Sequence, residues 1–383
     1  MSNQNKIIAI VGGGPGGLTL ARLLQIKGEQ VKVYERDLNK EVRVQGATLD
    51  LHVDSGLAAL EKAGLMNAFK ASYRPGAEKM RIVDKNATIR YDEHRESTNE
   101  GFGGKFSRPE IDRGPLRNML LESLHPGTVV WDSHFLAMSR QGDGWQLFFK
   151  NNTSAYADLV IGADGANSGI RPYVTPIQSF YSGVSVVDGN VYHSEKSTPV
   201  IHHLLKGGKI FAMGNCKDLI VSSKGDGSLN FYASCKTEEG WVKNGGIDFS
   251  DKSQVLQWFK KEFSGWGNIW LELFENASPP YIPRTLYCMP LDQFWDPLPN
   301  LTLLGDAAHL MPPFAGEGVN MAMLDALELS ECLDWNEVQK SIASYEENMR
   351  KRGAEAAQAS LENAEWMHSE NALNLMLDMF KSV

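Results

Sequence analysis

The chain has 383 residues, of which 42% are hydrophobic and 22% charged, an ordinary soluble globular mix whose length predicts two packed domains. The formal net charge of −9 argues against a nucleic-acid partner and gives no reason for attraction to anionic membranes. The first apolar run is too short for a signal-peptide core, and no stretch approaches the roughly 20 apolar residues that span a bilayer. The four cysteines are widely spaced, outside zinc-ligand patterns, so we expect a cytoplasmic protein without a bound metal.

The chain opens with the pattern of a nucleotide-binding strand–turn–helix unit. Residues 7–11 (IIAIV) predict a parallel strand buried on both faces, and a glycine-rich turn (GGGPGG) separates them from an apolar-striped helix. Gly12, Gly14 and Gly17 have the spacing that permits a tight turn, a close approach to a pyrophosphate and close helix–strand packing. Glu35 ends the next strand, where a carboxylate can accept hydrogen bonds from ribose hydroxyls. This pattern alone does not separate NAD from FAD.

Two more acidic residues follow apolar strands further along the chain. The run at residues 157–162 leads into Asp164 of DGANSGIR, and the run at residues 301–304 leads into Asp306 of GDAAH. Ligands of open α/β sheets bind outside the carboxyl ends of the strands, so we expect both side chains at one ligand-binding edge. For Asp306 the alternative role is a helix N-cap, and for Asp164 it is an internal ion pair with Arg171.

The middle and the end of the chain differ from this opening. Between residues 179 and 283, short apolar runs alternate with Gly, Asp and Asn turns, which predicts an antiparallel sheet inserted into the first domain. From residue 320 to about residue 380 the pattern is mainly helical.

Together, the glycine turn, the Asp164 segment and residues 305–320 (GDAAHLMPPFAGEGVN) resemble the three motifs of the single-component (class A) FAD-dependent aromatic hydroxylases, and most of all the tetracycline-inactivating monooxygenases. The resemblance implies an α/β fold with three parts: a Rossmann-like FAD-binding domain with a parallel sheet, an inserted antiparallel β-sheet substrate domain, and a C-terminal bridging helix. It covers most of the chain for fold and cofactor, and matches the insert poorly. The implied division gives the FAD-binding domain residues 1–70, 104–177 and 284–354, the substrate domain residues 71–103 and 178–283, and the bridging helix residues 355–383.

The resemblance further implies that distant segments hold one FAD. Asp306 would accept a hydrogen bond from a ribityl hydroxyl, and Arg117 would reach the FAD phosphates from a helix face that it shares with Arg113. Arg36 would lie beside the adenine and Arg43 near the NADPH path. The alternative for each is an exposed charge, which for Arg36 is an equally good interpretation. The implied FAD-binding set is Gly12, Gly14, Gly17, Glu35, Arg36, Arg43, Asp50, Arg117, Asp164, Asp306, Pro313, Gly316, Gly318 and Asn320.

Residues 312–320 (PPFAGEGVN) are expected to begin a helix whose N-terminal amides are directed at the pyrimidine edge of the flavin. The usual family residue at position 317 is Gln, whereas this chain has Glu317. We expect its side chain to point away from the ring, because its charge would oppose flavin reduction. We expect His309 to be a buried structural residue rather than a base.

The chain has one glycine fingerprint, whereas reductases that hold two dinucleotides usually carry two. The resemblance implies that NADPH visits transiently as co-substrate and reduces a flavin that swings outward. The reduced flavin would then react with O₂ to give a C4a-hydroperoxide, which hydroxylates a polycyclic phenol or enol such as a tetracycline. No catalytic side chain is assigned, because the cofactor carries the chemistry. We expect a monomer; the alternatives are an FAD oxidoreductase without oxygen insertion, a monooxygenase for another aromatic substrate, and a non-catalytic flavin-binding protein.

The substrate pocket is expected between the inserted sheet and the flavin, lined by Phe211, Met213, Asn230 and Phe314. Phe211 and Met213 alternate on one strand face, so core packing is the stronger interpretation for at least one of them. Asn230 falls where the tetracycline-inactivating enzymes have a histidine.

Overall fold

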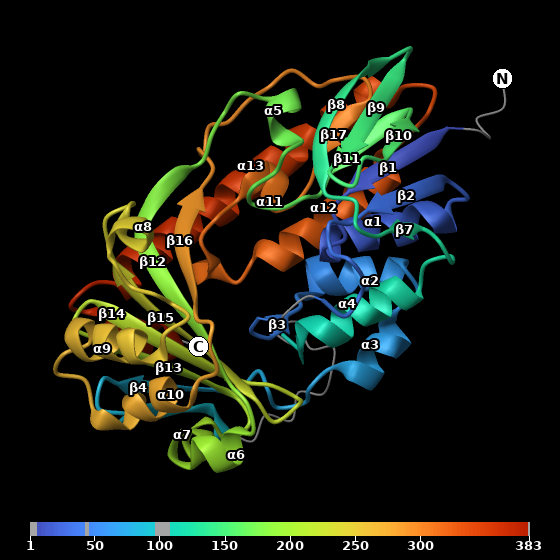
Figure 1. Cartoon of the computed structure of the whole chain (residues 1–383). Coiled ribbons are helices and arrows are strands. Elements are labelled where there is room, and N and C mark those ends of the chain that lie inside the picture. Colours follow the sequence, from blue (N-terminus) through green and yellow to red (C-terminus); the bar gives the residue numbers. More distant parts are fainter. Residues whose placement is uncertain (1–5, 43–45, 96–107, 382–383) are drawn as a thin grey trace.

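The computed structural model describes residues 6–42, 46–95 and 108–381, which form two large sheets with separate hydrophobic cores (Figure 1). In these ranges, one sheet has five strands, all paired in parallel. Their order across the sheet is β17 (Leu301–Leu303), β11 (Leu159–Gly162), β1 (Ile7–Val11), β2 (Gln30–Tyr34) and β7 (Val129–Val130).

The centre of this parallel sheet is apolar because its strands are covered on both faces. Ile8 and Ile10 of β1 are fully buried, as are Val160 and Ile161 of β11. The elements that surround the sheet are α1 (Pro15–Ile26), α2 (Ala58–Lys62), α3 (Met66–Ser72), α4 (Arg113–Glu122), α12 (Gly318–Cys332) and a three-stranded sheet of β8 (Phe135–Gln141), β9 (Gly144–Phe149) and β10 (Ser154–Ala157). Helices α1 and α12 pack closely against each other. The predicted Rossmann-like half of the fold is therefore confirmed.

The second sheet has seven strands within the described residues, and only the β13–β4 pair is parallel. Its order is β16 (Ile282–Cys288), β12 (Phe180–Val191), β15 (Leu229–Lys236), β14 (Lys217–Ser223), β13 (Lys209–Gly214), β4 (Met80–Asp84) and β5 (Ile89–Asp92). Strands β4 and β5 come from an earlier stretch of the chain and join the edge of the sheet. The predicted antiparallel insert is confirmed.

The two faces of the seven-stranded sheet differ because side chains alternate along each strand. One face packs on α9 (Lys252–Glu262) and α10 (Leu271–Asn276) through an aromatic core in which the Phe259 and Phe274 rings stack at 4.0 Å. The other face is more polar in its middle, where β15 presents Asn230, Tyr232 and Ser234. Near β4 and β13 this second face is apolar and is covered by α14 (Ala372–Lys381).

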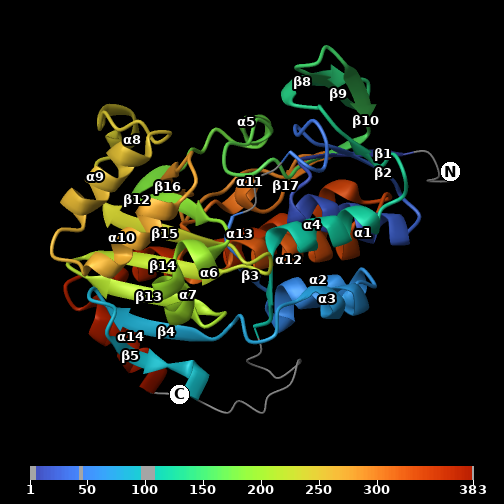
Figure 2. The same ribbon diagram turned by 60° about the horizontal axis from the view of Figure 1, so that its bottom comes forward.

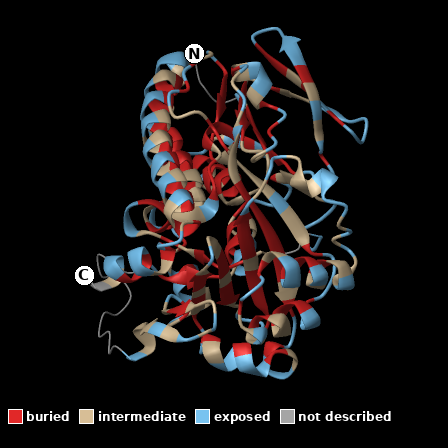
Figure 3. Cartoon of the chain, turned by 90° about the vertical axis from the view of Figure 1, so that its left-hand side faces the viewer, coloured by how far each residue is buried: buried red, intermediate tan, exposed pale blue. Residues whose placement is uncertain are grey.

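A 30-residue helix, α13 (Val338–Met367), joins the two halves and exposes one long face to solvent (Figures 1 and 3). Near its start the Tyr345 hydroxyl donates to the Leu303 carbonyl of β17, and just past its end His368 contacts Ser234 of β15 (Figure 2 gives a second view). The fold class predicted from the sequence, including a C-terminal bridging helix, is confirmed.

The domain boundaries predicted from the sequence do not all coincide with element ends. The boundary after residue 283 falls inside β16, which belongs to the seven-stranded sheet, and the boundary after residue 354 falls inside α13. The boundary after residue 103 lies outside the described residues. Among the helices of the described ranges, none is long and apolar enough to cross a membrane.

The aromatic core beneath the seven-stranded sheet supplies a stability prediction. Phe274→Ala removes a fully buried ring that contacts Phe259 and Phe231, and we expect a loss of about 3–5 kcal/mol of unfolding free energy in denaturant titration. The matched substitution Phe294→Ala, at a ring that is 67% exposed, should cost less than about 1 kcal/mol. Equal losses in the two variants would contradict this assignment of the core.

Candidate functional site

The glycine turn between β1 and α1 is shaped by two close backbone contacts. A Cβ on Gly12, whose φ is +111°, would lie 2.2 Å from the Ala163 carbonyl oxygen, and a Cβ on Gly17 would lie 2.2 Å from the Gly12 carbonyl oxygen. A Cβ on Gly14 would have no heavy atom of the described residues within 4 Å. Packing thus explains Gly12 and Gly17, while Gly14 leaves open space at the N-terminus of α1, where free amides and the helix dipole favour an anion.

Glu35 holds this turn from the end of β2. Its carboxylate is buried and accepts hydrogen bonds from the backbone amides of Gly13 (2.8 Å) and Asp37 (3.1 Å). Arg36 is exposed at the same strand end, and Arg43 lies outside the described residues. The predicted roles of all three toward FAD remain predictions.

The Asp164 segment forms a turn that is stabilised by its own hydrogen bonds and is joined to the third motif by Arg171. The Asp164 carboxylate accepts hydrogen bonds from the Ser168 hydroxyl (2.6 Å) and the Gly169 amide (2.7 Å), and burial raises its pKa above the ordinary value. Within the described residues, the Arg171 guanidinium makes no hydrogen bond to that carboxylate. It donates to the backbone carbonyls of Ala307 (2.7 Å) and Asp306 (2.8 Å), so it joins the second motif to the third.

Asp306 begins α11 (Asp306–His309), directly after β17, with Gly305 at the N-cap position. Burial raises the pKa of the Asp306 carboxyl, and the positive charges of His309, Arg113 and Arg171 partly oppose that effect. A Cβ on Gly318 would lie 3.9 Å from Asp306 Oδ1, so this carboxylate faces the start of α12.

The register of the parallel sheet brings the three motifs to one edge. Val11 of β1 pairs with Gly162 of β11, and Gly162 pairs with Leu303 of β17. The turns that follow these strands therefore begin at the same level, which is the geometry of a ligand-binding edge in an open α/β sheet.

The two arginines of α4 have different surroundings. The Arg117 guanidinium is buried, donates to Asp37 (3.0 Å) and to the Lys40 carbonyl (3.1 Å), and lies 5.4 Å from the Trp131 ring. It is therefore engaged near the end of β2, and its predicted contact with the FAD phosphates remains a prediction. Arg113, which we did not include in the binding set, is more exposed and close enough to Asp306 to lower its pKa.

The Asn320 side chain joins two segments of the chain. It is fully buried: Oδ1 accepts from the His52 amide (2.9 Å) and the Ser55 hydroxyl (3.2 Å), and Nδ2 donates to the Asp50 carbonyl (3.0 Å). These hydrogen bonds join α12 to β3 (Leu49–Asp50), and the predicted contact of Asn320 with FAD remains a prediction.

Beside these hydrogen bonds, the Glu317 side chain contacts His52, with 3.4 Å between Oε1 and Nδ1. The other ring nitrogen of His52, Nε2, lies 3.1 Å from Asp50 Oδ2. Pro313 and Gly316 are exposed on the turn that precedes Glu317, and Gly316 has φ +71°. A Cβ on Gly316 would lie 3.8 Å from the Asp50 carboxylate.

His309 is buried, and its Nε2 lies 2.6 Å from Asp325 Oδ2. Burial disfavours the imidazolium, but the charge and hydrogen bond of Asp325, together with the Asp306 charge, outweigh that effect and raise the pKa of His309. Arg352 also binds Asp325 (2.9 Å). This arrangement fits the structural role that we expected for His309.

The predicted substrate residues form two separate groups. Met213 is buried in the apolar cluster beneath α14, and Phe211 and Phe314 pack against the same cluster. Asn230 is buried elsewhere on the sheet and donates to Asp188 (2.7 Å) and to the Gly189 carbonyl (3.0 Å). Substrate contact by any of the four remains a prediction.

The sequence analysis did not predict a buried cluster formed by Ser234, His368 and Asp218. Ser234 Oγ (2.8 Å) and Asp218 Oδ2 (3.1 Å) both lie near His368 Nε2, while Nδ1 contacts the Ala364 carbonyl (2.7 Å). A catalytic triad needs serine and carboxylate on opposite ring nitrogens, so this cluster holds the end of α13 against the sheet instead.

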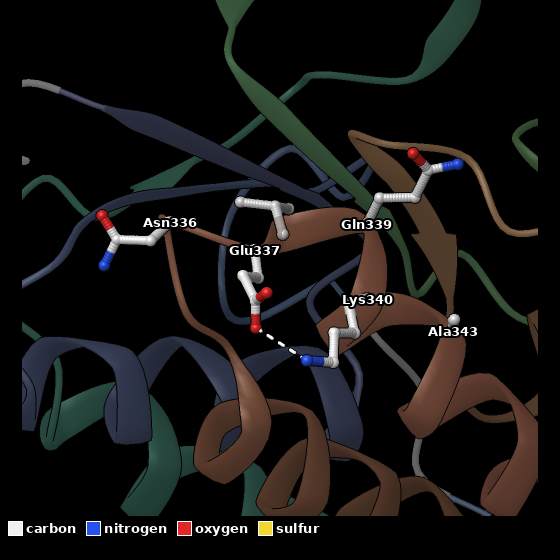
Figure 4. A pocket seen from close by; sticks show the side chains of 6 residues that line it. Asn336, Glu337, Gln339, Lys340 and Ala343 are labelled. Carbon is white, nitrogen blue, oxygen red and sulfur yellow. Dashed lines mark hydrogen bonds and ion pairs between the residues drawn. The ribbon is translucent and has the colours of Figure 1, made fainter.

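A surface hollow at the start of α13 is unrelated to the three motifs (Figure 4). It is lined by residues 336–340 and Ala343, and Glu337 and Lys340 form a 3.0 Å ion pair across it. Its walls carry only ordinary surface side chains.

A family model matches most of the chain. Residues 5–204 and 299–360 match the family model described as "FAD binding domain". The chain belongs to this FAD-binding family.

Its relatives by sequence are oxygenases. The chain is 25% identical to the monooxygenase penA of Penicillium thymicola, over 98% of each chain. It is 27% identical to the 3-amino-4-hydroxybenzoate 2-monooxygenase PtmB3 of Streptomyces platensis, over 96% of this chain and 90% of that one. The tetracycline destructase Tet(51) has the same fold, with a TM-score of 0.73 at 17% identity, over 99% of this chain and 95% of the other. The protein is an FAD-dependent monooxygenase.

The residues present suit FAD. The open space at Gly14 lies at a helix N-terminus, as a diphosphate requires, and the Asp306 carboxylate lies at the same edge near the start of α12.

Because Gly17 and Gly14 have different surroundings, we expect different effects when each is replaced by alanine. Gly17→Ala forces a methyl group into the Gly12 carbonyl and should cost about 1–3 kcal/mol of unfolding free energy. Gly14→Ala should cost less than about 1 kcal/mol, yet weaken FAD binding on the order of tenfold or more, because the methyl occupies the proposed diphosphate position. Denaturant titration and flavin fluorescence titration measure the two effects. Unchanged FAD affinity in Gly14→Ala would place the diphosphate elsewhere.

Proposed function

We propose that this monooxygenase consumes NADPH and transfers one oxygen atom of O₂ to a carbon of a polycyclic phenol or enol. The observation that carries the proposal is the contact of the seven-stranded sheet with the segment around the pair of β3 and β6 (Glu110–Ile111), which Asn320 ties to α12 beside the third motif. Tyr232 Oη of β15 accepts a hydrogen bond from the Ala47 amide (3.3 Å), and Lys209 of β13 pairs with Glu110 of β6. A substrate held on the polar face of this sheet would lie beside the segment that Asn320 ties to α12.

Bound FAD would supply the two-electron chemistry with NADPH and with O₂. The chain's own residues would bind and orient it. The amides at the start of α1 would hold the diphosphate, the Asp306 carboxylate a ribityl hydroxyl, and the amides at the start of α12 the electron-rich edge of the ring. We also propose that Arg113 takes the cofactor-facing role that we first assigned to Arg117, since it acts on Asp306.

The atoms balance without an acid–base side chain. NADPH contributes a hydride and the solvent a proton; one oxygen atom enters the substrate and the other leaves as water. The protein must position the substrate and exclude water, and Phe314, packed in the cluster under α14, is placed to help with that exclusion.

We propose tetracyclines as substrates, supported by the shared fold of the tetracycline destructase Tet(51) and by the resemblance of the three sequence motifs. The relative PtmB3, a 3-amino-4-hydroxybenzoate 2-monooxygenase, supports a smaller phenol as the alternative. From the sequence pattern we further infer a monomeric, cytoplasmic enzyme.

The reaction is tested by incubating purified protein with FAD, NADPH and a tetracycline panel under ¹⁸O₂. We expect NADPH oxidation that depends on the substrate, and a product that contains one labelled oxygen. NADPH oxidation without label would support an FAD oxidoreductase. Label in 3-amino-4-hydroxybenzoate but in none of the tetracyclines would replace the proposed substrate class.

The Asp306 carboxylate provides a second test. Asp306→Ala should lose bound FAD, because a partly buried acceptor at the shared edge disappears, while the Gly12–Ala163 contact that shapes the turn stays intact. The visible spectrum of the purified protein measures the loss, and far-UV circular dichroism controls for folding. A fully flavinylated, active Asp306→Ala protein would contradict the assignment.

A further inference from the structure

Three ionisable side chains meet between β3 and the start of α12, beside the turn proposed to face the flavin. His52 lies in the middle, with Asp50 at one ring nitrogen (3.1 Å) and Glu317 at the other (3.4 Å). The side-chain exposures are 17% for His52, 23% for Asp50 and 26% for Glu317, so all three are partly shielded from water.

This contact joins segments that are far apart in the chain. Glu317 occupies the N-cap position of α12, but its side chain caps no amide of that helix and reaches to His52 instead. The buried Asn320 amide holds the backbone of His52 and Asp50 from the same helix. The imidazole is therefore fixed between two carboxylates by a rigid frame.

We propose that His52 is a positioning residue whose imidazolium holds and neutralises Glu317, and thereby sets the charge beside the flavin ring. The proposal rests on the proposed placement of FAD at this edge. A carboxylate beside a ring that gains negative charge on reduction would oppose reduction; a fixed cation between Glu317 and Asp50 cancels part of that opposition.

The charges around His52 favour its protonated form. Burial alone would lower the pKa of His52, but the hydrogen bonds and charges of Asp50 and Glu317 raise it to about 9. Burial would raise the pKa of Asp50, but His52 and Lys209 together lower it below the ordinary value. His52 and Asp50 are thus both ionised at neutral pH.

Beyond Asp50, positively and negatively charged side chains continue to alternate. Lys209 of β13 acts on Asp50 and pairs with the buried Glu110 of β6, whose own pKa is raised by burial. The groups that face the His52 pair from every packed element are therefore Asp50, Glu317, Lys209 and Glu110.

The first experiment follows the ring signals of ¹⁵N-labelled histidine against pH, in protein without added flavin. We expect His52, assigned with His52→Gln, to titrate near pH 9, and Glu317→Gln to lower its pKa by about one unit or more. The matched control is Glu337→Gln, at the N-cap position of α13 in an ion pair with Lys340, which should leave His52 unchanged. An unchanged His52 titration in Glu317→Gln would overturn the proposal.

The second experiment measures the midpoint potential of bound FAD in a double-mutant cycle. His52→Gln should shift the potential to a more negative value, because Glu317 is left uncompensated. Glu317→Gln should shift it the other way, and in the Glu317→Gln background His52→Gln should shift the potential much less than it does in wild type, because the carboxylate that His52 holds is gone. The control is His203→Gln, at an exposed histidine. Additive shifts, with no coupling between the two substitutions, would overturn the proposal even if the titration succeeds.

The two arms separate this inference from the proposed function. If the protein binds no flavin, the function fails while the titration still decides whether His52 and Glu317 interact. If NADPH oxidation and oxygen transfer proceed normally but the potentials show no coupling, the function stands and the role of His52 falls. Glu317→Gln is conservative at a partly exposed site, so the test survives a failure of His52→Gln to fold.

Discussion

The contact between the glycine turn and the end of β11 is the constraint on which the rest of this protein depends. Gly12 and Gly17 leave no room for a Cβ, so β1, α1 and the Ala163 backbone meet at the closest possible distance. The parallel register then brings the turns after β1, β11 and β17 to the same level. The close approach also opens the N-terminus of α1 at Gly14, where no packing requirement of the described protein fills the space. The anion site is thus a consequence of how the sheet and helix fit together.

The charged side chains at this edge are stabilised by partners rather than by contact with water. Arg171 donates hydrogen bonds to backbone carbonyls of the third motif, and Glu35 accepts one from a backbone amide of the first. The edge also contains carboxylates that would repel one another and an anionic ligand. Arg113 near Asp306, and His52 between Asp50 and Glu317, are the compensating cations. Unpaired, each of these shielded carboxylates would pay a desolvation penalty.

The sequence predicted the parts of the fold that local patterns encode. Apolar runs, glycine spacing and turn residues predicted the parallel sheet and the antiparallel insert, and both are confirmed. Side-chain partners across long separations were not predictable. Arg113 and Arg117 share a helix face, but only the folded chain shows that Asp37 takes Arg117. Likewise the Asn320 amide matched a motif, while its role depends on His52 and Asp50, which are remote in sequence. Helical and strand periods carry no information about such pairs.

The most direct measurement is a crystal structure of the protein with FAD bound. The account predicts the diphosphate on the amides at the start of α1 beside Gly14, and the isoalloxazine beside the exposed turn that contains Gly316, with His52 between Asp50 and Glu317. A flavin bound away from the shared edge of β1, β11 and β17, or a ring remote from Gly316, would contradict it.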